Sequence, residues 1–322
     1  MSLRAALLGL LLALQACAGA QQTGSRAAPV AEAGGRFIEE GAIKVAGLPD
    51  QRITIWLPPG YDAEGRHYPV LYMHDGHNLF DPAKSNFNKV WAVDKALISL
   101  VANGTIEPHI VVGIWAPGRD RFRQYLPQVA SEAAKGDLAR KISDGLNGGA
   151  VVSARYLQWI ADELKPRIDR EFRTKGGVSD TAIAGSSMGG IMSCYTIVER
   201  PDVFGRAACV SSHWPIVMPD ASDTLRGEVS AMWRDWLAPR LGQPNGRRIW
   251  MDHGTATLDA HYAPYQRVID AEFRAAGWIE GRDWVSREYV GAEHEENAWA
   301  RRLPEVLGWL LAGDGSLANP AN

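Results

Sequence analysis

Cysteine is scarce in this chain, and basic residues do not outnumber acidic ones. Three cysteines among 322 residues, Cys17, Cys194 and Cys209, cannot form the disulfide framework of a small secreted domain. Since Cys194 falls in a helix-compatible stretch and Cys209 in an apolar run, we expect both to be buried free thiols. With 34 Lys and Arg against 37 Asp and Glu, the net charge is −3, which offers no basic surface for nucleic acid.

Long hydrophobic runs are also lacking, apart from a short one near the N-terminus. Arg4 precedes the apolar segment 5–14, which is too short to cross a bilayer but typical of a signal peptide. Residues 1–20 are therefore predicted to be a processing signal. Cleavage before Cys17 would leave a lipid anchor on this cysteine, whereas cleavage after Ala20 would release a soluble protein. Both cleavage sites predict an extracytoplasmic protein.

The remaining chain has the composition of one large globular unit. Residues 21–35, rich in Ala, Gly and Gln, are predicted to be a flexible spacer, and residues 36–313 a single domain. Within this domain, continuous apolar runs suit strands that are covered on both faces, and helical segments separate these runs. The alternation predicts an α/β protein with a mostly parallel, doubly wound sheet. The expected strands are 69–74, 110–115, 182–184, 206–211, 248–252 and 284–290, and the expected helices are 156–164, 191–199, 265–276 and 303–311.

Three segments depart from this alternation. Residues 52–57 alternate between apolar and polar, which predicts an antiparallel strand. Residues 130–149 are polar and contain glycine, which predicts a loop at the edge of the sheet. Residues 214–246 are predicted to be a helical insertion, because their apolar pairs recur at helical spacing. This insertion could form a wall over the site or lie at the periphery.

The motif Gly185-x-Ser187-x-Gly189 is the most informative part of the sequence. A short apolar run enters it and a helix-compatible stretch leaves it, which is typical of a nucleophile elbow. Small residues beside the serine allow such a strained turn to close. We therefore predict that Ser187 is a nucleophile rather than part of a plain glycine-rich turn, and that the amide of Met188 stabilises an oxyanion.

A serine nucleophile needs a histidine base, which a carboxylate must hold in one tautomer. In α/β hydrolases these residues follow in the order serine, acid, histidine. His294 comes directly after the last predicted strand, and we predict that it is the base. Two acids are candidates, because Asp252 ends the strand at 249–251 and Asp259 lies in the loop that follows. Asp259 could instead cap a helix, and Glu293 and Glu295 are further candidates for the acid.

Several segments resemble the esterase D and enterochelin-esterase-like family of α/β hydrolases, which includes feruloyl esterases and mycolyltransferase antigens. The resemblance spans about residues 52–311 and is strongest at 70–81, 185–190, 200–205, 252–259 and 291–294. It implies the α/β-hydrolase fold and no cofactor. It also favours Asp259 as the acid and the amide of His77 as the second oxyanion donor.

The predicted function is a serine esterase that cleaves a small-molecule or saccharide-linked ester through an acyl-enzyme. An acyltransferase with a sugar or lipid acceptor and a non-catalytic saccharide- or siderophore-binding relative are the competing hypotheses. Asp75, Trp115 and Trp214 are candidate substrate-binding residues, although each indole could instead pack in the core. His74 and His77 lack a third ligand at fitting spacing, so no metal site is expected.

Overall fold

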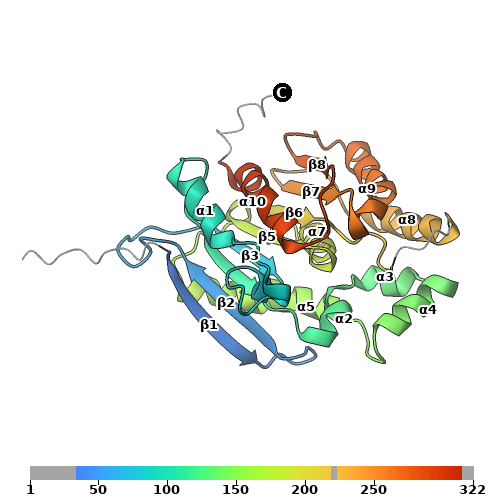
Figure 1. Ribbon diagram of the computed structural model, residues 1–322, viewed down its shortest axis with the longest axis horizontal. Coiled ribbons are helices and arrows are strands. Elements are labelled where there is room, and N and C mark those ends of the chain that lie inside the picture. The colour runs from blue at the N-terminus through green and yellow to red at the C-terminus, as the bar shows by residue number, and fades with distance from the viewer. Residues whose placement is uncertain (1–33, 219–222, 314–322) are drawn as a thin grey trace, which may run out of the picture. The chain divides into compact units, whose positions relative to one another are not determined.

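The computed structural model describes residues 34–218 and 223–313 (Figure 1). The predicted signal peptide and the lipid-anchor candidate Cys17 lie outside these residues, as does nearly all of the predicted spacer. An eight-stranded sheet organises the described part, in the order β1-β2-β4-β3-β5-β6-β7-β8. The strands are β1 (Arg36–Ile43), β2 (Gln51–Leu57), β3 (Val70–His74), β4 (Ile110–Ile114), β5 (Thr181–Ser186), β6 (Arg206–Val210), β7 (Arg248–Gly254) and β8 (Trp284–Tyr289).

The sheet is mostly parallel, as predicted. Strands β3 to β8 all run in one direction, whereas β2 is antiparallel to both β1 and β4. The prediction overlooked β1, an edge strand that leaves Phe37 exposed and therefore lacks a continuous apolar run. The α/β-hydrolase fold class is confirmed.

Helices cover both faces of the sheet, because neighbouring strand residues point to opposite sides. On β3, Leu71 and Met73 pack with α1 (Val93–Ala102) and α10 (Glu296–Leu311), whereas Tyr72 faces the cluster on the other side. That second cluster contains residues of α5 (Ser153–Trp159), α6 (Lys165–Glu171), α7 (Met188–Glu199) and α9 (Ala263–Ala275). A π-helical turn at Ile160–Leu164 joins α5 to α6.

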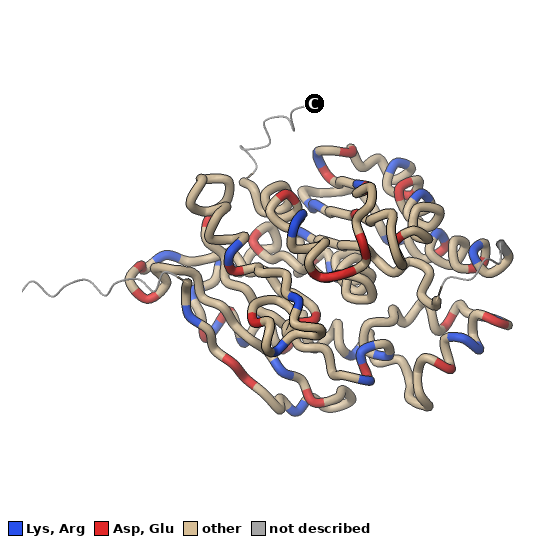
Figure 2. The backbone as a smooth tube through the Cα atoms, in the orientation of Figure 1, with Lys and Arg blue, Asp and Glu red and all other residues tan. Residues whose placement is uncertain are grey.

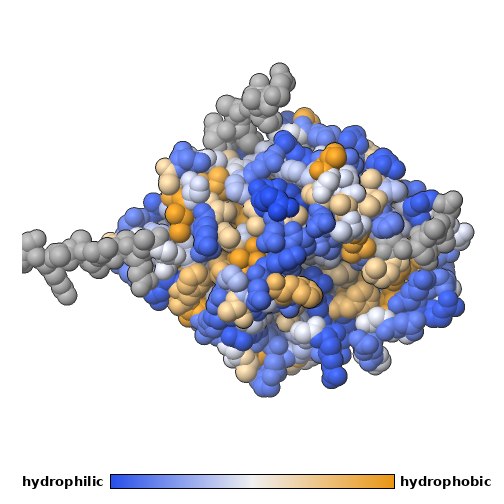
Figure 3. Space-filling view, in the orientation of Figure 1, coloured by the Kyte–Doolittle hydropathy of each residue, from blue (hydrophilic) through white to orange (hydrophobic). Residues whose placement is uncertain are grey.

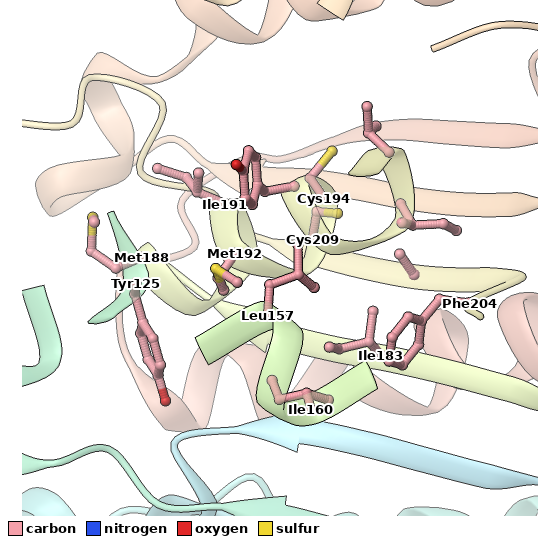
Figure 4. Packing of buried hydrophobic residues seen from close by; sticks show 14 of the residues in the cluster. Tyr125, Leu157, Ile160, Ile183, Met188, Ile191, Met192, Cys194, Phe204 and Cys209 are labelled. Carbon is pink, nitrogen blue, oxygen red and sulfur yellow. The ribbon is translucent and has the colours of Figure 1, made fainter. Parts of the chain in front are cut away.

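The two cysteines in the described part are buried free thiols, as expected. Cys194 belongs to α7 and Cys209 to β6, and Figure 4 shows them side by side in the larger core cluster, among side chains of α7 and β5. Burial raises the pKa of Cys209, so this thiol is held protonated and packs as an apolar group.

Most of residues 130–149 are helical, so the prediction of a loop there is wrong. They form most of α3 (Gln128–Ala133) and α4 (Gly136–Gly145), in which only Ala130, Leu138 and Ile142 are buried. With so few apolar positions, a helical pattern cannot be recognised in this otherwise polar sequence. Both helices contact α8 (Asp223–Leu237), which occupies the predicted insertion 214–246. Figure 1 shows α3, α4 and α8 gathered at one end of the sheet.

Charges of both signs are interspersed along the backbone (Figure 2). No helix among residues 34–218 and 223–313 is both long and apolar enough to cross a membrane.

Candidate active site

Ser187 occupies a strained turn between β5 and α7. Its φ of 59° and ψ of −123° lie in a backbone region that residues other than glycine rarely adopt, so the surrounding contacts must hold the backbone there. The Ser187 amide donates to Val210 O at 3.0 Å, and its carbonyl accepts from the amides of Ile191 and His213. Only glycine fits at 185, because a Cβ there would lie 2.7 Å from the carbonyl oxygen of Gly189.

His294 and Asp259 form a short hydrogen-bonded pair. His294 Nδ1 lies 2.6 Å from Asp259 Oδ1, and the carboxylate is almost completely buried in the 3-10 turn Thr257–His261. Ser211 Oγ and the amide of Gly254 each donate to the other oxygen, Oδ2, at 2.6 Å. Burial alone would raise the pKa of Asp259, but the hydrogen bonds from His294, Ser211 and Gly254 bring it below its usual value. The carboxylate is therefore ionised and fixed in orientation.

Asp252, the second candidate acid, is fully buried in a different hydrogen-bond network. It lies inside β7 rather than at its end, because the strand continues to Gly254. Arg302 Nη2 is 2.6 Å from its Oδ1, and Trp250 Nε1 donates to its Oδ2 at 2.8 Å. Both carboxylate oxygens are thus used by groups other than His294.

Glu295 and Glu293, the two remaining candidate acids, do not contact His294 through their carboxylates. Glu295 caps α10 by accepting from the amides of Asn297 and Ala298, and it pairs with Lys89 at 2.8 Å. Glu293 is exposed. The carboxylate of Asp259 accepts from Gly254 and Ser211 and does not cap α9. Among the four candidate acids, only Asp259 hydrogen-bonds His294.

Ser211 joins the two carboxylates. Its hydroxyl donates to Asp259, its amide donates to Asp252 at 3.1 Å, and Arg302 Nη2 approaches the hydroxyl at 2.6 Å. Trp299 Nε1 donates to the same oxygen at 3.0 Å. Neither Ser211 nor Arg302 was predicted from the sequence. The position of Ser211 just after β6 is a usable signal, whereas nothing in the sequence marks Arg302 on the last helix.

His213 and Tyr262 connect the nucleophile to the base. The His213 amide donates to the carbonyl of Ser187, and its Nδ1 lies 2.6 Å from the Tyr262 hydroxyl. The Tyr262 ring meets the rings of both His213 and His294 at centroid distances of 5.6 Å. Burial, with a smaller effect of the nearby His294, lowers the pKa of His213 to about 3, so its imidazole is neutral. Ser187 and His294 are therefore linked through two intervening residues, His213 and Tyr262.

No hydrogen bond joins the Ser187 hydroxyl to His294 in the described part of the chain. Such bonds are often long before substrate binds and tighten only in the reacting complex.

A cavity of about 450 Å³ opens beside Ser187. Its walls are mostly apolar, and Lys141 and Asp144 of α4 add two charged groups. Figure 3 shows hydrophobic surface next to a hollow near the middle of this face. The apolar walls are formed by Phe122, Met188, Ile216, Val217, Met218 and Leu258, and Gly145 and His213 also line the cavity.

The loop after β3 packs closely against the elbow. Asp75 starts the 3-10 turn Gly76–Asn78 with a φ of 56°, and Arg121 holds its carboxylate through two bonds of 2.7 and 2.9 Å. A Cβ on Gly189 would lie 3.1 Å from His74 and 3.2 Å from Asp75, so this loop and the start of α7 touch. The predicted oxyanion donors at 77 and 188 therefore belong to neighbouring segments.

Two predicted substrate-binding residues have other contacts. Burial opposes the ionisation of Asp75, but Arg121 nevertheless brings the pKa of Asp75 below its usual value, so this ion pair anchors the loop. Trp214 is 1% exposed and donates from Nε1 to Gln266 at 2.8 Å, so its indole offers no face to a substrate. Trp214 therefore packs in the core.

Trp115 is half-buried and lines a second cavity, and His74 and His77 each have a polar neighbour of their own. His74 Nδ1 lies 3.0 Å from the Tyr156 hydroxyl, and His77 Nε2 lies 3.1 Å from the side-chain nitrogen of Asn86. Within residues 34–218 and 223–313, no group of three or more His, Cys, Asp or Glu side chains is arranged to hold a metal ion.

Comparison with known proteins identifies the class of the molecule. A family model described as "Putative esterase" matches residues 49–310, so the chain belongs to this esterase family. The resemblance seen in the sequence is confirmed, and the protein is a carboxylic ester hydrolase by family.

The relatives among curated proteins include two that differ in how much of their length matches. An uncharacterized protein of Bacillus subtilis, YbbA, is 21% identical over 83% of this chain and 95% of its own length. An endo-1,4-beta-xylanase/feruloyl esterase of Xylanibacter ruminicola is 26% identical over 48% of this chain, but the match spans only 18% of that longer protein.

Solved structures share the fold at low sequence identity. A ferulic acid esterase matches with a TM-score of 0.59 and 18% identity, covering 86% of this chain and 97% of its own. An IroE-like serine hydrolase from Shewanella oneidensis matches with a TM-score of 0.60 and 18% identity, over 85% and 79% of the two chains. An enterobactin esterase from Shigella flexneri matches with a TM-score of 0.59 and 17% identity, over 85% and 57%.

Proposed function

We propose that the protein is a serine esterase in which Ser187, His294 and Asp259 form a catalytic triad. The observation that carries this proposal is the 2.6 Å pair between His294 and Asp259, which fixes the imidazole beside a strained serine elbow. With its Nδ1 bonded to Asp259, His294 presents Nε2 as the base.

The proposed reaction has two halves. His294 takes the proton of Ser187 as the serine oxygen bonds to the ester carbonyl carbon, and then gives this proton to the departing alcohol oxygen. Water attacks the resulting acyl-enzyme with its proton passing to His294, and the acid leaves as the serine is restored. Ionised Asp259 stabilises the imidazolium formed in each half.

The amides of Met188 and His77 are proposed to stabilise the oxyanion. Met188 is the first residue of α7, whose N-terminal end carries a partial positive charge. The clamp of Arg121 on Asp75 would hold the His77 segment in place before substrate arrives, which is the condition for strong electrostatic stabilisation.

The cavity beside Ser187 favours an acyl group with an apolar body. Its volume of about 450 Å³ is in the range of small-molecule sites, and its apolar walls suit an aromatic acid better than a free sugar. The similarity in fold to ferulic acid and enterobactin esterases supports this choice. We further propose that the signal peptide predicted at 1–20 places the enzyme outside the cytoplasm.

Replacing the nucleophile tests this proposal. We expect Ser187→Ala to lower kcat on p-nitrophenyl acetate by about 10⁶-fold and to abolish labelling by a fluorophosphonate probe. Ser179→Ala, which removes an exposed hydroxyl at the opposite end of β5, is the matched control and should behave as the wild type. Wild-type turnover by Ser187→Ala would overturn the proposed mechanism.

A further inference from the structure

The segment 213–218, here the wall segment, follows β6 and forms one side of the cavity beside Ser187. Three of its apolar side chains line this cavity, namely Ile216, Val217 and Met218. Their exposure differs greatly, because Met218 is 71% exposed whereas Ile216 is only 1% exposed. Met218 therefore lies at the mouth of the cavity, and Ile216 lies at its inner end as the least exposed of the apolar lining residues.

The backbone of Ile216 is strained. Its φ of 70° lies in the left-handed region, which a β-branched residue rarely adopts and which glycine adopts freely. Such a conformation persists only where the surrounding structure enforces it, and it occurs most often at functional sites. An isoleucine stands here although glycine would suit the backbone better, so its side chain must contribute something that offsets this cost.

Hydrogen bonds fix the wall segment relative to the nucleophile. The Ile216 amide donates to the His213 carbonyl at 2.9 Å, and the His213 amide donates to the Ser187 carbonyl at 3.1 Å. The His213 side chain is bonded to the Tyr262 hydroxyl and to the backbone of Val217. The backbone of residue 216 is therefore two hydrogen bonds away from that of the proposed nucleophile.

The wall segment is also held on the side away from the nucleophile. The buried Trp214 donates to Gln266, and its carbonyl accepts from Trp233 Nε1 of α8 at 2.7 Å. The two indole rings meet edge to face at 5.2 Å. Since the segment is anchored on both sides, loss of the Ile216 side chain should leave its space open rather than let the wall collapse.

We propose that Ile216 is a specificity-determining residue that limits the length of the acyl group. Its side chain closes the inner end of the cavity, so an acyl chain that extends inward from Ser187 ends against it. The proposal rests on the esterase function proposed above and gives Ile216 no part in the chemical steps.

Esters that differ only in the acyl chain test the proposal. Values of kcat/KM are compared for p-nitrophenyl acetate, butyrate, hexanoate and octanoate, and the readout is the ratio of octanoate to acetate. We expect Ile216→Ala to raise this ratio about tenfold, because the freed space accepts one or two further methylenes. Ile216→Val removes one carbon and keeps the branched Cβ, so it should raise the ratio about threefold. A ratio measured in one preparation does not depend on the fraction of protein that is folded.

Ile106→Ala is the matched control. Ile106 is also a buried isoleucine that lines a cavity, but this cavity lies at the opposite end of the sheet, so the ratio should stay that of the wild type. An equal rise in Ile106→Ala would show that any loosening of the core has this effect, and it would contradict the proposal.

Ile216→Gly separates the side chain from the backbone strain. It should raise the ratio as Ile216→Ala does, and it should unfold at a higher urea concentration than Ile216→Ala, because glycine adopts a positive φ without strain. Unfolding of the glycine variant at a lower urea concentration would contradict the strained backbone from which the inference starts.

The outcomes separate this inference from the proposed function. An unchanged or lower ratio in Ile216→Ala and Ile216→Gly, with Ser187 still labelled by a fluorophosphonate, would overturn the inference and leave the esterase proposal intact. Failure of the wild type to cleave any of the four esters or to react with the fluorophosphonate would instead refute the proposed function, and this inference with it.

Discussion

Ser211 donates a 2.6 Å hydrogen bond to Asp259 Oδ2, the carboxylate oxygen that His294 does not use. The same hydroxyl lies 2.6 Å from Arg302 Nη2, which also binds Asp252. The proposed triad acid is thus tied to a second buried carboxylate through one serine and one arginine. We infer that Ser211 is a positioning residue, since it would act through Asp259 rather than on substrate.

Removal of this hydroxyl should slow the reaction without weakening substrate binding. We expect Ser211→Ala to lower kcat about tenfold, equivalent to about 1.4 kcal/mol, with KM within about twofold. Ser212→Ala is the matched control, because the adjacent hydroxyl is buried and has no partner among the described residues. A wild-type kcat in Ser211→Ala would contradict this positioning role, because the other contacts of Asp259 would then be sufficient to hold its carboxylate in place.

Replacing Asp259 and replacing Asp252 by asparagine should have different effects. Asp259→Asn should stay folded and lose about 10⁴-fold in kcat, because the amide no longer holds the required tautomer of His294. Asp252→Asn should instead lower the free energy of unfolding by about 3–5 kcal/mol, because buried Arg302 loses its charged partner. Urea unfolding and kcat per titrated active site separate these effects. A large loss of kcat in an Asp252→Asn variant of normal stability would contradict the assignment of Asp259 as the acid.

The ion pair between Arg121 and Asp75 should matter for both stability and rate. Asp75 is nearly buried and Arg121 is about one-third exposed, so we expect Arg121→Gln to cost about 2–4 kcal/mol of unfolding free energy. The His77 segment would also lose its anchor, which should lower kcat. Arg119→Gln changes an exposed arginine on the same turn and should have little effect in either assay.

Buried histidine should make the fold sensitive to mild acid. Burial lowers the pKa of His109 to about 4, against 6.5 for an ordinary histidine, so the unfolded chain binds this proton more readily between these values. The free energy of unfolding therefore falls as pH falls from 6.5 to 4, by up to about 1.4 kcal/mol per pH unit for this residue.

His109→Gln tests this by flattening that slope in urea unfolding at several pH values. His109 lines a cavity at the opposite end of the sheet from Ser187. The esterase kcat and KM of the variant can therefore serve as a check that it is folded. His67→Gln, which removes an exposed histidine, should keep the slope of the wild type. An identical slope in His109→Gln would contradict the expected titration.

Local patterns were sufficient to predict the parallel strands and the elbow. The apolar runs in β3 to β7 are easy to recognise because strands buried on both faces consist mostly of apolar residues. Edge strand β1 and helix α4 escaped prediction for the opposite reason, since each buries only part of its surface. Each is held by a neighbouring element, β1 by β2 and α4 by α8, which follows much later in the chain.

Long-range contacts explain what the sequence left open at the site. Asp252 and Asp259 are both plausible acids by position. They are separated by the hydrogen bond of Asp259 to His294 and by the bonds of Asp252 to Arg302 and Trp250. Asp75 and Trp214 carry groups that suit a substrate, but Arg121 and Gln266 already bind them. Neither partner could be inferred from spacing along the chain.

The most direct test of the proposed mechanism is to trap the acyl-enzyme. Rapid quenching with p-nitrophenyl acetate, followed by peptide mass spectrometry, should find one acetyl group on Ser187 in the wild type. None should be found in Ser187→Ala, with a burst of p-nitrophenol seen only in the former. An acetyl group on another residue, or ester turnover with neither a burst nor a modified Ser187, would contradict the account.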